Sequence, residues 1–164
     1  MAMWYLLKKK AYPFIIFNRA IAFEKSNYDC VIRDVNEYAA ISYFVNYMME
    51  NVMKELEKEK IIHTINSSIE EKLTDLEYQT LLYILTMKGL KTVKDFVAFY
   101  RRLNNKISVE AVYKTMIEPL LIKGILDIEK ETGSFLFGKT PNMVFGINAT
   151  KFDIDIENTK RIQL

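Results

Sequence analysis

The sequence predicts a mainly α, α+β protein: an N-terminal helical segment followed by a small domain that ends in a C-terminal β-hairpin. Three observations carry this prediction. Apolar residues recur at helical spacing in the first 60 residues. Polar residues interrupt that spacing after residue 62. The second half then shows short helical patterns, followed by two runs of strand-forming residues around a turn that holds glycine and proline.

Composition limits the function before any motif is considered. The 164 residues carry 23 Lys and Arg against 21 Asp and Glu, too even a balance for a protein built mainly around polyanion binding. One cysteine, Cys30, excludes an internal disulfide, and with one histidine, His63, it leaves no Cys/His zinc site. Only 5 glycines are present, so a Gly-rich phosphate loop is not expected. We therefore expect no enzyme activity, no cofactor and no metal.

The N-terminus does not have the order of a secretion signal. Its apolar residues precede the basic run at residues 8–10, whereas a signal peptide places basic residues first. No apolar stretch approaches the ~20 residues that span a bilayer. We expect a cytoplasmic protein without membrane contact.

The helical segment is expected over residues 1–62. Its clearest element is a long amphipathic helix with regularly spaced apolar positions. These positions are Ile41, Phe44, Val45, Met48, Met49, Val52 and Leu56. Before it we expect a helix ending near Pro13, a helical turn over residues 20–25, and a helix capped by Ser26. The side chains expected in the core are those of Met48, Met49 and Met53, with Cys30 buried or half-buried.

A polar linker is expected over residues 63–73, and a second domain over residues 74–148. Three helices are expected to open this domain. The first begins at a capping box formed by Thr74 and Glu77, and the second begins at Thr92. Ser108 is expected to cap the third. Pro119 lies late in that helix and should bend it or leave one carbonyl without a donor.

Two strands are expected after the helices, over residues 125–129 and 143–148, with a turn region over residues 131–142. Helix, helix, turn, helix and hairpin is the order of a winged helix, which we take as the prediction. The alternative is an unrelated small α+β domain with a terminal hairpin.

A tail is expected over residues 149–164. Phe152, Ile154 and Ile156 alternate there with acidic residues, which is typical of a short strand. We expect this strand to extend the edge of the sheet, in this chain or in a neighbouring one.

Residues 3–60 contain four segments that match one known family in order and spacing. They read WYLLKKKAY, FNRAI, NYDCVIRD and AISYFVNYMMENV. Together they resemble the region of Fic-family proteins that follows the catalytic motif. Many members of that family carry a winged-helix domain after this region, which agrees with the prediction for the second half.

The resemblance implies a family chemistry, the transfer of a nucleotide monophosphate to a protein hydroxyl. The residues that perform it are missing here, because the family's motif, in which a His, a Pro-Phe pair, an acidic residue and a Gly-Asn-Gly-Arg run follow one another, does not occur in this sequence. His63 lies too far along the chain to replace the catalytic base. We therefore expect a non-catalytic C-terminal piece of such a protein.

A DNA-binding role would depend on the third helix and the hairpin, since the third helix of such folds enters the major groove. The expected DNA contacts are Arg101, Arg102, Asn104, Lys106, Ser108, Lys114 and Lys139. Glu110 and Glu118 on the same helix would repel phosphates. A solvated surface on an interaction domain is an equally good reading.

Protein contacts are expected at apolar residues that a free domain would leave uncovered. These are Trp4, Leu7, Phe135 and Phe137. We expect the chain to form a homodimer and to regulate or bind a partner, protein or DNA, through its winged helix. The alternative is a free-standing winged-helix transcription regulator that dimerises through its N-terminal helices.

Overall fold

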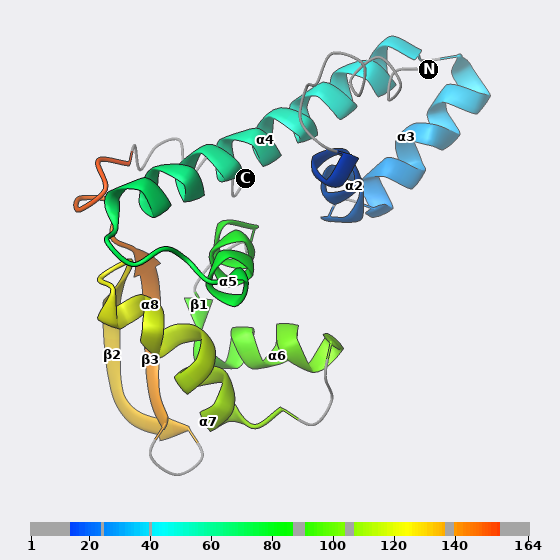
Figure 1. Ribbon diagram of the computed structural model, residues 1–164. Coiled ribbons are helices and arrows are strands. Elements are labelled where there is room, and N and C mark those ends of the chain that lie inside the picture. Colours follow the sequence, from blue (N-terminus) through cyan, green and yellow to red (C-terminus); the bar gives the residue numbers. More distant parts are fainter. Residues whose placement is uncertain are drawn as a thin grey trace. The chain divides into compact units, whose positions relative to one another are not determined.

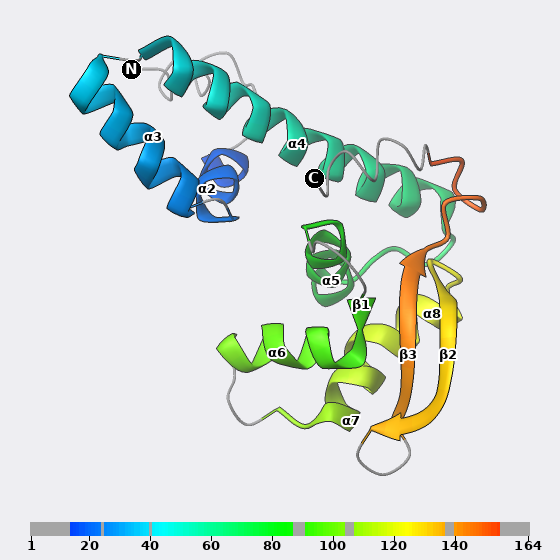
Figure 2. The same cartoon turned by 180° about the vertical axis from the view of Figure 1, so that it is seen from behind.

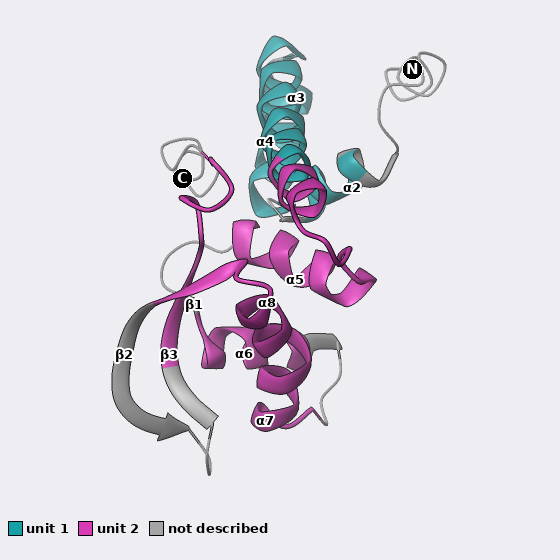
Figure 3. Ribbon diagram, turned by 60° about the vertical axis from the view of Figure 1, so that its left-hand side comes forward, with its two compact units in different colours: residues 1–60 teal, residues 61–164 magenta. Residues whose placement is uncertain are grey.

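Figure 1 shows the computed structural model of the chain. The backbone is described for residues 14–23, 25–39, 41–86, 91–103, 107–136 and 140–154. The chain divides into two compact units, with the boundary between Lys60 and Ile61 (Figure 3). We call them unit 1 and unit 2.

Unit 1 consists of helices. They are α2 (Phe14–Phe23), α3 (Lys25–Tyr38) and the first part of α4 (Ile41–Ser68). α2 is thus longer than the expected turn, and Ser26 lies within α3 and not before it as a cap. The chain reverses between α3 and α4 at Ala39, whose φ of 53° is in the left-handed region.

The described part of unit 1 buries four apolar side chains. They are Ile16, Ala20, Val31 and Met48. Tyr28 and Phe44 join α3 to α4 through an edge-to-face ring contact, with the ring centroids 6.2 Å apart. Among the described residues of this unit, few large side chains are therefore fully enclosed.

Charged side chains also connect α2 to α4. Arg19 donates from Nε to Glu55 at 3.2 Å and also pairs with Glu59. Glu55 pairs in turn with Lys58, and only 2% and 5% of these two residues are exposed. Removing one member of such a buried group would leave an uncompensated charge, so we expect the loss of any one of them to weaken the packing of α2 on α4.

The expected linker at residues 63–73 is wrong in its first half, because α4 continues to Ser68. Ile62 and Ile65 are fully buried in the core of unit 2 and keep the helical apolar spacing. The polar residues lie on the other side of the helix. Ser68 donates from its hydroxyl to the Thr64 carbonyl, a bond that a helix accommodates.

Unit 2 continues with α5 (Asp75–Thr86) and α6 (Val93–Leu103). The predicted capping box at α5 is confirmed. The Thr74 amide donates to Glu77 at 2.7 Å, and the Glu77 amide donates to the Thr74 hydroxyl at 3.3 Å. The sequence TVKD forms the same arrangement before α6, where the Thr92 amide donates to Asp95 at 2.7 Å.

The third helix of unit 2 is made of α7 (Val109–Val112), the π-helical turn η1 (Tyr113–Ile117) and α8 (Glu118–Ile122). Pro119 has no amide to donate, and the wider turn lies directly before it. The structure thus has a π-helical turn where a bend or a carbonyl without a donor was expected. The helix ends where Gly124 takes a φ of 63°.

Three antiparallel strands complete unit 2 (Figure 2). They are β1 (Lys91–Thr92), β2 (Leu126–Leu136) and β3 (Thr140–Ile147), in the order β1-β3-β2. Ile128 pairs with Phe145, and Thr92 pairs with Val144. β2 and β3 extend through most of residues 131–142, which was expected to be a turn region. Backbone pairing across the two strands accommodates the glycine and proline there, with two shifts of register.

The expected strand in the tail is wrong for the described residues 149–154. A compact turn is present instead, in which the Ile154 amide donates to the Ala149 carbonyl and Asp153 has a φ of 51°. The turn places Phe152 in the core of unit 2, with 4% of the residue exposed. The burial of the Phe152 ring thus favours the turn over the strand that the alternating pattern predicts.

The core of unit 2 lies between its helices and the sheet. Its largest fully buried side chains are Phe96, Phe145, Ile62, Ile65, Leu81, Ile84, Leu85, Ile117, Leu120, Ile125, Leu126 and Val93. Rings from α6 and β3 meet there, with Phe96 and Phe145 in edge-to-face contact. The predicted fold class, mainly helical with helices before a C-terminal hairpin, is confirmed.

Candidate functional site

The exposed face of the third helix is the first candidate surface. Ser108 begins this helix as predicted: its Oγ accepts a hydrogen bond from the Ala111 amide at 3.1 Å. Thr115 donates from its hydroxyl to the Ala111 carbonyl. Both hydroxyl groups therefore have partners within the helix, and Ser108 acts there as a cap.

Lys114 lies on the same face and is paired. Its Nζ is 3.0 Å from Oε1 of Glu110, one helical turn away, and both side chains are well exposed. The hydrogen bond to Glu110 and the charge of that carboxylate raise the pKa of Lys114, with a smaller contribution from Glu118. The described part of this face therefore offers no net positive charge to a phosphate.

The other expected DNA contacts are described only in part. Arg101 is exposed on the last turn of α6. The side chain of Arg102 and all of Asn104, Lys106 and Lys139 lie outside the described residues. The structure therefore places Arg101 on α6, and Ser108 and Lys114 on the third helix.

The expected protein contacts also fall outside the described part of the chain. This holds for Trp4, Leu7, Phe137 and the side chain of Phe135. The backbone of Phe135 is described, and it pairs with Pro141 across the hairpin. These four predictions remain predictions.

A second candidate surface was missed from the sequence. Ile41, Val45, Met49 and Met53 lie one turn apart along α4 and are 63%, 49%, 60% and 51% exposed. We call these four residues the α4 ridge. The expectation that Met49 and Met53 are core residues is therefore wrong, whereas Met48 is buried as expected. The available signal was the width of the apolar face of this helix, which includes both the buried Met48 and the four exposed positions.

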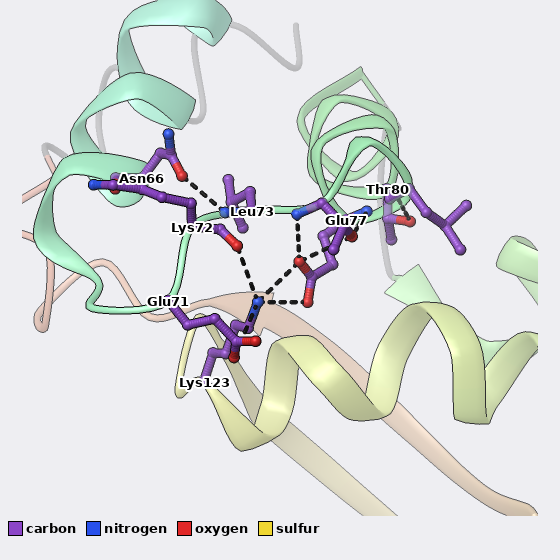
Figure 4. A network of polar contacts seen from close by, with 9 residues as sticks. Asn66, Glu71, Lys72, Leu73, Glu77, Thr80 and Lys123 are labelled. Carbon is purple, nitrogen blue, oxygen red and sulfur yellow. Dashed lines mark hydrogen bonds and ion pairs between the residues drawn. The ribbon is translucent and has the colours of Figure 1, made fainter.

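A third cluster lies in unit 2, where Lys123 meets the start of α5 (Figure 4). Lys123 Nζ is 2.9 Å from both carboxylate oxygens of Glu77 and 3.6 Å from Oε2 of Glu71. It also donates to the Lys72 carbonyl at 3.4 Å. The cluster joins the end of α8 to the segment before α5.

The environment of this cluster determines its charge state. Burial alone would raise the pKa of Glu77, but hydrogen bonds from the Thr74 amide and from Lys123 lower it below the ordinary value. Burial would likewise lower the pKa of Lys123, and Glu77 and Glu71 raise it instead. Both groups are therefore ionised at neutral pH. Because the Lys123 ammonium and the Glu77 carboxylate pair with each other, the cluster stabilises the fold and offers no free group for chemistry.

The described residues do not contain a complete set of groups for nucleophilic catalysis, that is, a nucleophile, a base and an oxyanion site together. Ser67 Oγ lies 3.3 Å from Nδ1 of His63, but both residues are exposed on one helix. The nearby backbone amides take part in the hydrogen bonds of α4 and are not free to stabilise an oxyanion. Within the described ranges, no three His, Cys, Asp or Glu residues are grouped to hold a metal ion.

Cys30 is exposed, which corrects the expectation of burial, because it lies on the outer side of α3.

Comparison of the chain with protein-family models, curated proteins and solved structures finds no match. None of the helices in the described ranges combines the length and apolar character needed to cross a bilayer. The function is therefore argued from the residues and their geometry.

Proposed function

We propose that this chain is the non-catalytic C-terminal region of a Fic-family protein, and that it acts in regulation by binding a protein partner. The four sequence segments that resemble the family lie in α2, α3, α4 and the residues before them. The proposed lack of activity rests on the absence of the family's catalytic run from the sequence. The proposed lack of activity also agrees with the position of His63, which lies on the exposed side of α4.

We take unit 2 as a winged helix for this proposal. The order α5, β1, α6, third helix, β2 and β3 agrees with that architecture, and so does the pairing of the short β1 with the outer side of β3. In such a fold the third helix and the hairpin are the surfaces that meet a partner.

The observation that carries the choice of a protein partner is the Lys114–Glu110 pair. DNA binding draws most of its affinity from Lys and Arg side chains that displace counterions from phosphates. On the described part of the third helix, the basic side chain is already opposite a carboxylate, and Glu118 adds another. A nearly neutral face of this kind suits a protein better than a polyanion.

A DNA-binding assay tests the choice of partner. Fluorescence anisotropy with a random-sequence duplex at low and moderate salt is expected to show no binding. The matched variant is Glu110→Gln, which frees Lys114, and it should gain weak binding at low salt if charge pairing is the reason. Salt-dependent binding by the natural sequence, lost in Arg101→Ala, would overturn the proposal in favour of a DNA-binding regulator.

The genomic DNA upstream of the Met1 codon tests the family. A continuous reading frame that encodes the missing His and Gly-Asn-Gly-Arg run is expected. A stop codon directly upstream of the Met1 codon, in the same reading frame, would contradict the proposal that this is part of a larger Fic-family protein. Incubation of the chain with labelled ATP and candidate target proteins should transfer no label.

We further propose that the chain forms a homodimer through unit 1 and works in the cytoplasm. Support for the dimer comes from the apolar side chains that unit 1 leaves exposed on α4. Support for the compartment comes from the single, exposed thiol of Cys30 and the absence of any possible internal disulfide.

A further inference from the structure

Residues 148–154 follow β3 and form a compact turn, which we call the tail turn. The Asn148 amide donates to the Ile125 carbonyl at 2.9 Å, and the Lys151 amide donates to Oδ1 of Asn148 at 2.9 Å. Phe152 is buried in the core of unit 2, with Lys151 Nζ 5.3 Å from the centre of its ring. The tail turn is therefore attached to unit 2 through its backbone and through an aromatic side chain.

The Lys151 side chain connects the tail turn to the C-terminal end of α8. This end has the hydrogen bond of a Schellman motif, in which the Ile125 amide donates to the Leu120 carbonyl at 2.8 Å around the positive φ of Gly124. Lys123 is the cap residue, and the helix has no further amide that could donate to its carbonyl. Lys151 Nζ donates to this carbonyl at 2.7 Å. A cation from the tail turn therefore caps α8, where the helix end has a partial negative charge.

Lys123 makes contacts in two directions. Its carbonyl accepts from Lys151, while its own ammonium group lies 2.9 Å from both carboxylate oxygens of Glu77 (Figure 4). The Lys123 side chain is 13% exposed, so little water is at hand to replace either oxygen. Glu77 in turn accepts from the Thr74 amide at 2.7 Å, where α5 begins. One residue therefore joins the tail turn to the start of α5.

We propose that the tail turn is a strap that controls the start of α5 through Lys123. In the closed state, Lys151 fixes the carbonyl of Lys123, and the Lys123 side chain is held where it reaches Glu77. A short segment such as the tail turn can open while the rest of the unit stays folded. Opening removes the contact at the end of α8, and the bond between Lys123 and Glu77 weakens with it. The coupling is reciprocal, so loss of the Glu77 pair must favour the open strap.

Unit 2 contains an internal reference for a test of this coupling. The Thr92 amide donates to Asp95 at 2.7 Å at the start of α6, which is the bond that the Thr74 amide makes with Glu77. The hydroxyl group of each threonine donates to the same carboxylate as its amide. The two boxes have the same local chemistry, but Lys123 pairs with the first. A change at the strap should therefore reach Thr74 and not Thr92.

Hydrogen exchange of the backbone amides, followed by NMR on the full chain, tests the strap. Lys151→Met removes the donor and keeps most of the aliphatic side chain. It should accelerate exchange of the Thr74 amide about two- to tenfold relative to the Thr92 amide, the range typical of coupled residues. Lys151→Arg keeps a cationic donor and should restore most of the protection. Lys114→Met is the matched control, because it removes an exposed lysine of the third helix and should change neither amide.

The reciprocal measurement uses Glu77→Gln. This variant should accelerate exchange of the Asn148 amide, which donates to Ile125 at the base of the strap, by a similar factor relative to Thr92. The double variant with Lys151→Met and Glu77→Gln should shift the urea midpoint by less than the sum of the two single shifts. The double shift is smaller because each substitution already removes part of the same network.

Every outcome decides the coupling. Equal acceleration at Thr74 and Thr92 would show that Lys151→Met lowers the stability of unit 2 as a whole, which overturns the strap. Unchanged exchange at Thr74 overturns it too, and so does an unchanged Asn148 amide in Glu77→Gln or a pair of urea shifts that add. Because the strap does not involve the Lys114–Glu110 pair, these outcomes leave the DNA assay to decide the proposed partner.

Discussion

Lys123 Nζ lies 2.9 Å from each carboxylate oxygen of Glu77, and the pair connects two elements that are 46 residues apart. Glu77 is 4% exposed and also accepts from the Thr74 amide. One carboxylate therefore serves as a helix cap and as the partner of a cation from another helix. The pair holds the segment before α5 against the end of α8 and has no counterpart in the local sequence pattern.

Glu77→Gln is expected to lower the free energy of unfolding of unit 2 by about 1–3 kcal/mol. The amide can still accept from Thr74, but the largely buried Lys123 keeps, within the described part of the chain, just the exposed Glu71 as a charged partner. Urea denaturation followed by circular dichroism measures the change. Glu110→Gln is the control, because it removes an exposed pair and should leave the unfolding midpoint unchanged.

Stability should fall at acidic pH because of the same residue. The pKa of Glu77 is lower in the folded protein than its ordinary value of 4.5, so the folded state binds the proton less tightly than the unfolded state. The stabilisation is therefore complete above pH 4.5 and is lost as the pH falls through the lowered value. Urea midpoints of the natural chain and of Glu77→Gln should differ at pH 7 and approach each other below pH 4.5. A constant difference across that range would contradict the assignment.

Gly124→Ala is expected to destabilise unit 2 by about 1–2 kcal/mol, because φ at this position is +63°. An added Cβ would also lie 2.6 Å from Lys151 Nζ, the mobile end of a long side chain. Backbone strain should therefore dominate over the clash. Thermal unfolding of Gly124→Ala with and without Lys151→Ala checks this. Full recovery in the double variant would show that the clash dominates.

Ile65→Ala is expected to cost about 2–5 kcal/mol, since Ile65 is fully buried in the core of unit 2. His63→Ala, two residues earlier on the exposed side of α4, should have little effect. Denaturant unfolding of both variants measures the contrast. Equal, small effects would indicate that residues 63–68 behave as the linker that the polar composition suggests.

Local signals in the sequence were sufficient at two helix starts, where both partners of the interaction lie within a few residues, but not at Ser26, which lies inside α3. The box of Thr74 and Glu77 and the cap at Ser108 were both predicted and are present. Each depends on backbone groups of one helix end, so nearby residue types determine it. The order of helices before a hairpin followed from the same short-range patterns.

Predictions failed where a distant segment determines the outcome. Polar residues 63–68 remain helical because Ile62 and Ile65 enter a core built from residues further along the chain. The tail forms a turn because Phe152 is buried in that core. The hairpin is longer than expected because its two strands pair with each other through the predicted turn region.

The sequence by itself determined the order of helices before the hairpin, the caps at Thr74 and Ser108, and the absence of an internal disulfide. Tertiary structure decided which apolar residues are covered. Met48 and Met49 are adjacent and chemically identical, yet one is 6% and the other 60% exposed. Periodicity places both on an apolar arc, but only the positions of the neighbouring helices determine which part of the arc is buried.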